Sequence, residues 1–78
     1  MTISPEQSRA ARALVNIDQA ALAERSNLSR NTIVSFEKGQ RTPGANNLAA
    51  IRTALEAAGV VFIDQNGNGP GVRLRDRI

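Results

Sequence analysis

Four residue types are missing from this 78-residue sequence: cysteine, histidine, tyrosine and tryptophan. The lack of cysteine excludes a disulfide framework, thiolate metal sites and thiol catalysis. The lack of histidine removes the commonest metal ligand and the commonest general base. We therefore expect a protein that is not an enzyme and that uses no metal or other cofactor.

Aromatic residues and long apolar runs are also scarce. Phe36 and Phe62 are the only aromatic residues, which argues against a module that stacks single-stranded bases on a row of rings. No apolar run approaches the roughly 18 residues of a membrane span. Residues 1–6 have neither the basic nor the apolar region of a signal peptide. We expect one small domain that stays in the cytoplasm and does not contact a membrane.

Acidic residues are fewer than basic ones: seven Asp and Glu stand against ten Lys and Arg, a formal net charge of +3. A charge of this size is a weak indication of a polyanionic partner, because small soluble proteins often carry as much. The kind of cation is more informative. Nine of the ten are arginine, whose guanidinium group binds phosphate and guanine in a forked geometry.

Capping residues and apolar spacing predict a mostly α fold of four helices followed by two short strands. The residues that mark helix boundaries are the candidate N-caps Ser4, Asp18 and Ser29 and the candidate terminating glycines Gly39 and Gly59. The predicted helices span residues 5–15, 19–25, 30–38 and 45–58, and the predicted strands span 60–63 and 72–78. We divide the chain into a helical domain, 1–59, and a C-terminal β extension, 60–78.

Apolar residues three and four positions apart indicate which helix faces are buried. In the first helix Ala10, Ala11 and Leu14 share such a face. The residues expected to be buried in the next three helices are Ala21, Leu22, Ala23, Ile33, Phe36, Leu48, Ile51 and Leu55.

Residues 18–37 predict two short helices joined by a three-residue turn that contains one apolar residue, Leu28. Two helices joined in this way cross steeply, so the N-terminal half of the second helix protrudes. A helix-turn-helix inserts side chains into a DNA major groove in this manner. Ala23 is small enough for the close approach of the two helices.

The segment resembles the Xre/Cro-type helix-turn-helix family of phage repressors and bacterial regulators. The matching residues are Asp18, Gln19, Leu22, Ala23, Leu28, Ser29, Ile33, Phe36, Glu37 and Gly39. The resemblance extends from Ser4 to Gly59 and implies a four-helix, phage-repressor-like bundle from bacteria or phage. Two positions depart from the common pattern. Asp18 stands where Ser or Thr is usual, and Asn27 stands where Gly is frequent.

The resemblance implies that Arg30 and Asn31, in the first turn of the recognition helix, contact base edges. Arginine suits guanine and asparagine suits adenine in the major groove. Ser35 is expected as a third, weaker contact, and Val34 can cover a thymine methyl group. The alternative for all four is an ordinary solvated helix surface.

Contacts to the DNA backbone are expected from Gln19, Ser29, Thr32, Lys38, Gln40 and Arg41. The resemblance implies that Gln19 binds a phosphate and braces the recognition helix, and the alternative is an ordinary surface glutamine. Ser29 and Thr32 are capping or phosphate-contact residues. The last three follow the recognition helix, as the corresponding loop does in the family, and the alternative for them is a solvated loop.

Arg12 and Glu37 match a family ion pair that joins the first helix to the end of the recognition helix. That pair is expected to be structural, and the alternative is two solvated charges.

The C-terminal extension is expected to form a dimer, because one such domain contacts only half of a two-fold site and half-sites lie about 34 Å apart. The candidate dimerisation residues are Leu55, Val60, Phe62, Ile63, Val72 and Leu74. The two strands can pair within one chain or between chains. Alternating Arg73, Arg75 and Arg77 form a basic stripe that can protect an edge strand, contact flanking DNA or serve solubility; the first is preferred.

Together these features predict a sequence-specific double-stranded DNA-binding regulator, a homodimeric repressor or autoregulatory controller that binds an inverted repeat. Two alternatives remain. One is the antitoxin of a toxin–antitoxin pair, with a toxin as protein partner. The other is a protein-interaction module that has lost DNA binding.

Overall fold

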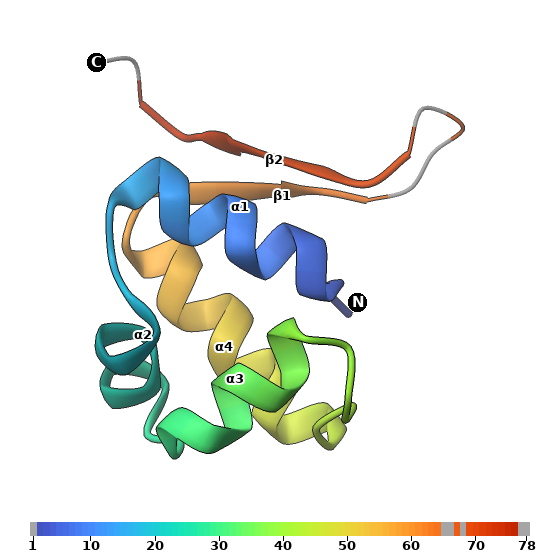
Figure 1. Cartoon of the computed structure of the whole chain (residues 1–78). Helices are drawn as coiled ribbons and strands as arrows, with labels where there is room; N and C mark the ends of the chain where they lie inside the picture. Colours follow the sequence, from blue (N-terminus) through green and yellow to red (C-terminus); the bar gives the residue numbers. More distant parts are fainter. Residues whose placement is uncertain (1, 65–66, 68, 77–78) are drawn as a thin grey trace.

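The computed structural model describes residues 2–64, 67 and 69–76. They form four α-helices and a two-stranded antiparallel sheet, in the order α1 Pro5–Val15, α2 Gln19–Ser26, α3 Arg30–Glu37, α4 Ala45–Ala57, β1 Val60–Ile63 and β2 Gly71–Leu74. The helices pack as a bundle, and the strands run along one end of it (Figure 1). The predicted mostly α fold with two C-terminal strands is confirmed. None of the described helices is long and apolar enough to cross a membrane.

Side-chain caps begin the first three helices. Ser4 Oγ accepts a hydrogen bond from Gln7 N at 3.0 Å, and the Gln7 side chain accepts one from Ser4 N at 2.9 Å, which completes a capping box. The side chains of Asp18 and Ser29 each accept a bond from a backbone N–H three residues further on, at 2.8 and 3.1 Å. Each such cap contributes about 1 kcal/mol, so these helix starts are determined locally.

A residue in the left-handed conformation lies at the end of each of these three helices. Asn16 and Asn27 are the C-caps of α1 and α2, and Gly39 follows the C-cap of α3. Asn16 and Asn27 have φ of 56° and 58°, and Gly39 has φ of 75°. Asparagine tolerates this conformation because its short polar side chain can bond locally. The N–H of Asn27 bonds to the carbonyls at the end of α2, so asparagine closes the turn between α2 and α3 without glycine.

A single core joins the helices to the strands. Leu22 of α2, Ile33 of α3, and Ile51 and Leu55 of α4 are completely buried, and Val60 of β1 is buried with them. The strand β1 therefore contributes to the same core as the helices.

The face that α1 buries differs from the predicted one. Ala11 is buried, but Ala10 is exposed and Leu14 is 38% exposed. The inner face of α1 carries Gln7 and Ser8 instead, which are 7% and 0% exposed. The prediction from apolar spacing was wrong because Gln7 and Ser8 form hydrogen bonds with other elements. These bonds offset the cost of burying polar side chains, and hydrophobic periodicity gives no information about them.

Strands β1 and β2 pair antiparallel within the chain, in a register that places Val60 opposite Leu74 and Ile63 opposite Gly71. Val60 and Phe62 point into the core, and Val61 and Ile63, on the other face of the strand, are half-buried. The pair packs on α1 and α4.

The second strand is shorter than predicted, because β2 ends at Leu74. The strand β1 begins directly after Gly59, whose φ of 113° turns the chain out of α4. One bond continues the pairing, from Arg75 N to Gly59 O at 2.8 Å, and the described residues contain no partner strand beyond it. Arg77 and Ile78, which were included in the predicted strand, lie outside the described residues.

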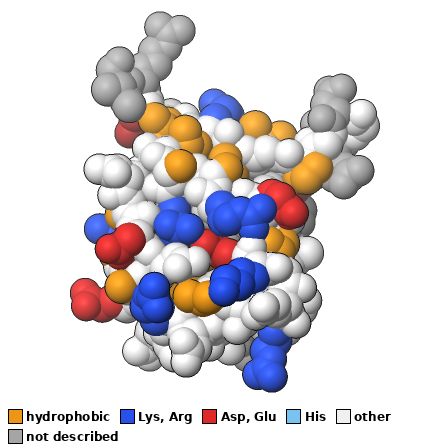
Figure 2. All heavy atoms as spheres, viewed as in Figure 1, with side chains coloured by type: hydrophobic (Ala, Val, Ile, Leu, Met, Phe, Trp, Pro, Cys, Tyr) orange, Lys and Arg blue, Asp and Glu red, His pale blue; other side chains and the backbone are white. Residues whose placement is uncertain are grey.

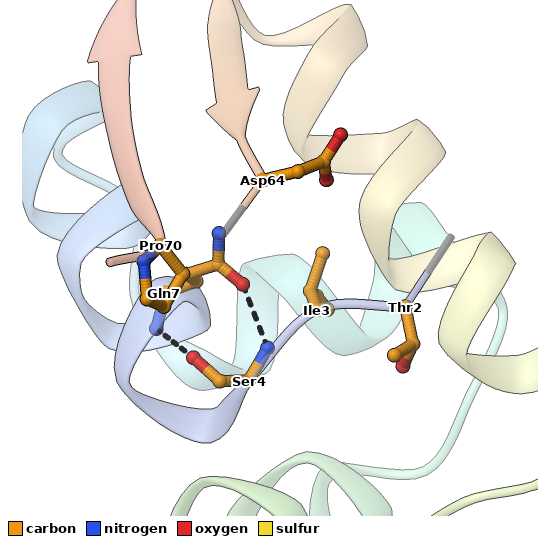
Figure 3. Close-up of a pocket in the computed structure, with 6 residues that line it drawn as sticks. All are labelled: Thr2, Ile3, Ser4, Gln7, Asp64 and Pro70. Atoms are coloured by element: carbon orange, nitrogen blue, oxygen red, sulfur yellow. Dashed lines mark hydrogen bonds between the residues drawn. The ribbon is translucent and has the colours of Figure 1, made fainter. Parts of the chain in front are cut away.

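Polar side chains anchor the strands to the helices. Gln7 Nε2 donates to the carbonyls of Ile63 and Gly71 at 3.2 and 3.1 Å. The guanidinium of Arg52 lies 5.1 Å from the centre of the Phe62 ring, a cation–π distance. A hollow of about 330 Å³ is lined by Thr2, Ile3, Ser4, Gln7, Asp64 and Pro70. Figure 3 shows these residues, which come from the N-terminal segment, α1 and the ends of the strands.

Candidate nucleic-acid interface

The turn between α2 and α3 is closed by local hydrogen bonds. Leu28 N donates to Ala23 O at 2.9 Å. Ser26 Oγ donates to Leu22 O at 2.7 Å. The half-buried Leu28 packs against the core from within the turn. The two helices are therefore fixed relative to each other, with the start of α3 directed away from the core.

The helix α3 has one buried and one outward face. Ile33 and Phe36 are 0% and 3% exposed. Arg30 and Asn31, in the first turn, are exposed, whereas Val34 and Ser35 are half-buried on the next turn. Four of the predicted contact positions thus lie on or beside one accessible surface, with the longest side chain at the helix start.

Ser29 and Thr32 serve the helix start. Their hydroxyl groups lie 2.8 Å apart in a hydrogen bond, and Ser29 Oγ also accepts from Thr32 N. Because one hydroxyl donates to the other, one further hydroxyl hydrogen of the pair is available to an external acceptor. The expected backbone contact is therefore compatible with the capping role.

The loop after α3 carries three exposed polar side chains, those of Lys38, Gln40 and Arg41. Its backbone is tied to α3, since Gln40 N and Arg41 N both donate to Ser35 O, at 2.9 and 3.4 Å. The left-handed Gly39 makes this return possible. The loop therefore presents its side chains from a fixed backbone.

The start of α4 is an anion-attracting feature that sequence reasoning missed. Its N-cap is Gly44, which supplies no side-chain cap, and its first turn contains no acidic residue. Asn46 and Asn47 there are exposed. Uncapped N–H groups and the helix dipole favour a negative charge at such an end. The signal was the glycine N-cap, in contrast to the capped starts of α1, α2 and α3.

A hollow of about 310 Å³ opens at the start of α2 and is lined by Arg12, Asp18, Gln19, Ala20 and Arg30. The guanidinium group of Arg12 borders it, but its charge is paired with Glu37. The guanidinium group of Arg30 and the N-terminus of α2 border it as well, and both attract an anion. Asp18 opposes them, because its carboxylate remains beside the hollow while it caps α2. Sequence reasoning gave Arg12 a structural role alone and did not place it beside Arg30.

Glu37 is the centre of a buried polar network. It is 2% exposed. Its carboxylate accepts two bonds from Arg12, from Nε at 2.9 Å and Nη2 at 2.7 Å. Ser8 Oγ donates to it at 2.6 Å and Gln19 Nε2 at 3.1 Å. Side chains of α1 and α2 thus meet at the last residue of α3, and the two residues predicted as an ion pair are in bidentate contact.

Burial by itself raises the pKa of Glu37, but hydrogen bonds from Arg12, Ser8 and Gln19 outweigh it and hold this pKa below its ordinary value. The same contact raises the pKa of Arg12. The pair is therefore ionised across the neutral range. Arg9 strengthens the junction, because its guanidinium donates to the backbone carbonyl of Glu37 and so caps the end of α3.

Figure 2 shows that Lys and Arg side chains are spread over the middle and lower part of the face in view, with acidic side chains between them. The strands lie at the other end of the molecule from α2 and α3 (Figure 1). The described arginines of the predicted C-terminal stripe, Arg73 and Arg75, are exposed at that end. Arg77 lies outside the described residues.

The candidate dimerisation residues fall into two groups. Leu55, Val60 and Phe62 are 0%, 1% and 7% exposed and belong to the core of the single chain. Their side chains are thus unavailable to a second chain in this fold, because burial in the protomer already covers them. Ile63, Val72 and Leu74 are half-buried and retain accessible surface, so contact with a second chain remains a proposal for these three.

Comparison with known proteins agrees with this geometry. Residues 9–57 match the helix-turn-helix family. Among solved structures, the chain is similar to the DNA-binding domain of the P22 C2 repressor, determined by nuclear magnetic resonance, with 33% sequence identity and a TM-score of 0.64. The similarity covers 72% of this chain and 75% of that one. No match was found among curated proteins.

Proposed function

Since this chain belongs to the helix-turn-helix family, we propose that it is a sequence-specific, double-stranded DNA-binding regulator of transcription. The observation that carries the proposal is the outward surface of α3, where Arg30 and Asn31 are exposed while the opposite face of the helix is anchored in the core. A rigidly held helix with an accessible N-terminal half is suited to insertion into a major groove.

Base contacts are assigned to the outward face of α3. Arg30 can form two bonds to the O6 and N7 atoms of guanine, and Asn31 two bonds to the N6 and N7 atoms of adenine. Val34 and Ser35, one turn further on, lie closer to the core and are suited to a thymine methyl group and to a single hydrogen bond. Each bidentate contact contributes about 1–3 kcal/mol of discrimination.

Contacts to the DNA backbone are assigned to the edges of the same surface. The hollow beside Gln19 is one phosphate site, and the uncapped start of α4 is a second. The segments between or next to these two phosphate sites carry the other proposed backbone contacts, Ser29, Thr32, Lys38, Gln40 and Arg41. Gln19 donates one amide hydrogen to Glu37 and has a second for a phosphate oxygen. Phosphate binding here would therefore act on a side chain that also braces α3.

We propose that the active form is a homodimer on an inverted repeat, with the C-terminal segment, residues 60–78, as its dimerisation element. One α3 contacts one half-site, and half-sites one turn apart are separated by about 34 Å. A protomer measures 30 Å in its longest dimension, so two protomers side by side can each occupy one major groove. Occupancy of a promoter by such a dimer excludes polymerase, which makes repression or autoregulation the expected outcome.

Selection of duplex DNA from a random pool, at near-physiological salt with non-specific competitor, tests the proposal. An enriched inverted repeat is the expected result. Arg30→Ala should then relax the preference at one base pair of each half-site. Arg41→Ala is the matched control: it should weaken all sequences about equally and reduce the salt slope by about one unit per contacting protomer. Salt-sensitive binding with no enriched motif would refute sequence-specific regulation and direct attention to a co-purifying protein.

A further inference from the structure

The carbonyl groups at the end of α3 are bonded from two directions. Such groups have no regular partner inside a helix. The carbonyl of Ser35 accepts hydrogen bonds from the loop that follows, at 2.9 Å from Gln40 N and 3.4 Å from Arg41 N. The carbonyl of Glu37 accepts instead from the guanidinium group of Arg9, on α1. The peptide unit through which the chain leaves α3 is therefore held by another helix.

Arg9 supplies a charge that α3 lacks. The last turn of α3 contains no basic residue, although a helix C-terminus favours a positive charge and a donor to its last carbonyls. The guanidinium group of Arg9 provides both from outside the helix. Its Nη2 atom also lies 3.9 Å from Glu6 Oε2, but the Glu6 side chain is 75% exposed, and exposed pairs of this kind contribute little. The bond to α3 is therefore the principal contact of this guanidinium group.

The loop after α3 takes its direction from this peptide unit. Gly39, with φ of 75°, turns the chain back, and the bonds from Gln40 N and Arg41 N to Ser35 O close the turn. The bond from Arg9 ties the start of the same loop to α1, which packs against α3. Two attachments to different helices fix the direction of a short segment more closely than one attachment does.

We propose that Arg9 is a positioning residue for DNA binding. By holding the carbonyl of Glu37, it fixes the direction in which the loop leaves α3. It thereby places the exposed side chains of Lys38 and Arg41 against the DNA backbone. Arg9 acts through the loop and does not itself contact a phosphate. The proposal deepens the function proposed above, and it rests on that function for the phosphate contacts of the loop.

Loss of the Arg9 side chain should leave the fold intact. This side chain is 48% exposed, and alanine is a better helix former than arginine. The carboxylate of Glu37 is held separately, by donors from α1 and α2, so the end of α3 stays attached to both helices. Arg9→Ala therefore changes the start of the loop without removing the network that holds α3.

Amide hydrogen exchange of the free chain, measured by nuclear magnetic resonance, tests the positioning without DNA. In Arg9→Ala the amides of Gly39 and Gln40, which bond to the end of α3, should exchange about tenfold faster than in the wild type. The amide of Leu22, a buried residue of α2, should exchange at an unchanged rate. Equal acceleration of all three amides would mean a general loss of stability and would overturn the proposal. Unchanged exchange at all three would overturn it as well.

DNA affinity gives the functional readout. The duplex carries one selected half-site, so that dimer formation does not enter the comparison. Arg9→Ala should weaken binding by about three- to tenfold and reduce the salt slope by up to about one unit, because the loop loses a phosphate contact. Arg41→Ala removes a phosphate contact of the loop directly. Adding Arg9→Ala to Arg41→Ala should therefore weaken binding much less than Arg9→Ala does alone.

Arg73→Ala is the matched control for the loss of one charge. It removes an exposed arginine at the end of the molecule away from α2 and α3 (Figure 1), and it should leave half-site binding unchanged. If the losses of Arg9→Ala and Arg41→Ala simply add, in affinity and in salt slope, Arg9 contacts a phosphate itself and the proposal is wrong.

These measurements separate failure of the positioning role from failure of the function. If selection enriches a DNA sequence but Arg9→Ala binds it as the wild type does, the proposed function stands and the role of Arg9 is refuted. If no DNA sequence is enriched, the function is refuted, and with it the claim that Arg9 positions DNA contacts. Amide exchange then still decides whether Arg9 holds the loop.

Discussion

Glu37→Gln should lower the free energy of unfolding by about 3 kcal/mol, because it removes the negative charge at the centre of a buried hydrogen-bond network that includes Arg12. Glutamine has nearly the same shape, but it replaces one carboxylate oxygen by an NH₂ group and removes the charge. The four donated bonds come from Arg12, Ser8 and Gln19. An NH₂ group directed at those donors leaves at least one donor and the Arg12 charge without a partner.

The magnitude follows from the burial of the two partners. Removing one member of a buried ion pair costs about 3–5 kcal/mol. The Glu37 side chain is 1% exposed, but that of Arg12 is 19% exposed and can be partly rehydrated, so the lower end of this range applies. A domain of 78 residues has a total stability of roughly 4–12 kcal/mol, at about 0.05–0.15 kcal/mol per residue. The substitution therefore removes a large fraction of the total.

Urea unfolding followed by far-ultraviolet circular dichroism is the suitable assay, because the sequence has no tryptophan or tyrosine for fluorescence. Glu24→Gln, at an exposed position of α2, is the matched control and should change stability by less than about 0.5 kcal/mol. Adding Arg12→Met to Glu37→Gln should cost far less than the two single changes together. If Glu37→Gln costs under about 1 kcal/mol, or if the two changes are additive, the network does not hold α3 as argued.

Three further predictions concern pH, DNA affinity and backbone conformation. The pKa of Glu37 is lower in the folded chain than in the unfolded chain. The contribution of Glu37 to the free energy of unfolding is therefore complete above the unfolded carboxylate pKa of about 4.3 and is lost as pH falls through the folded pKa. Unfolding measured over a range of acid pH should show this loss of stability in the wild type and not in Glu37→Gln. Asp18→Asn keeps the α2 cap but removes a negative charge beside the hollow, so it should tighten DNA binding at low salt by several-fold; weaker binding, measured by fluorescence anisotropy of labelled DNA, would contradict a phosphate site there. Gly39→Ala should destabilise the chain by about 1–2 kcal/mol, since φ of 75° is unfavourable with a Cβ; a neutral result in urea unfolding would mean that the loop after α3 can relax.

Much of the fold was predictable because its signals are local. Ser4, Asp18 and Ser29 each bond within three residues, so sequence spacing alone indicates where those helices begin. The turn between α2 and α3 is equally short in range, and its apolar residue and small Ala23 are apparent from the sequence. The resemblance to a family then indicated which residues of α3 to expect on the outward surface.

Predictions failed or stayed open where partners are distant in sequence. The buried face of α1 is polar because Ser8 bonds to Glu37, 29 positions away, and Gln7 bonds to Gly71, 64 positions away. No local pattern distinguishes such residues from a solvated helix surface. The exposed Leu14 was mistaken for a core residue for the same reason.

The sequence by itself determined the basic composition. It also determined the helices, their caps and the steep turn, because these depend on neighbouring residues. The tertiary structure decided which faces were buried, the meeting of Arg12 and Arg30 at one hollow, and the pairing of β1 with β2 inside one chain. It also decided where β2 ends, because a strand extends only as far as its partner. These features depend on side chains that are distant in sequence and that folding brings together. The free energy that stabilises them comes from contacts that form only in the folded chain.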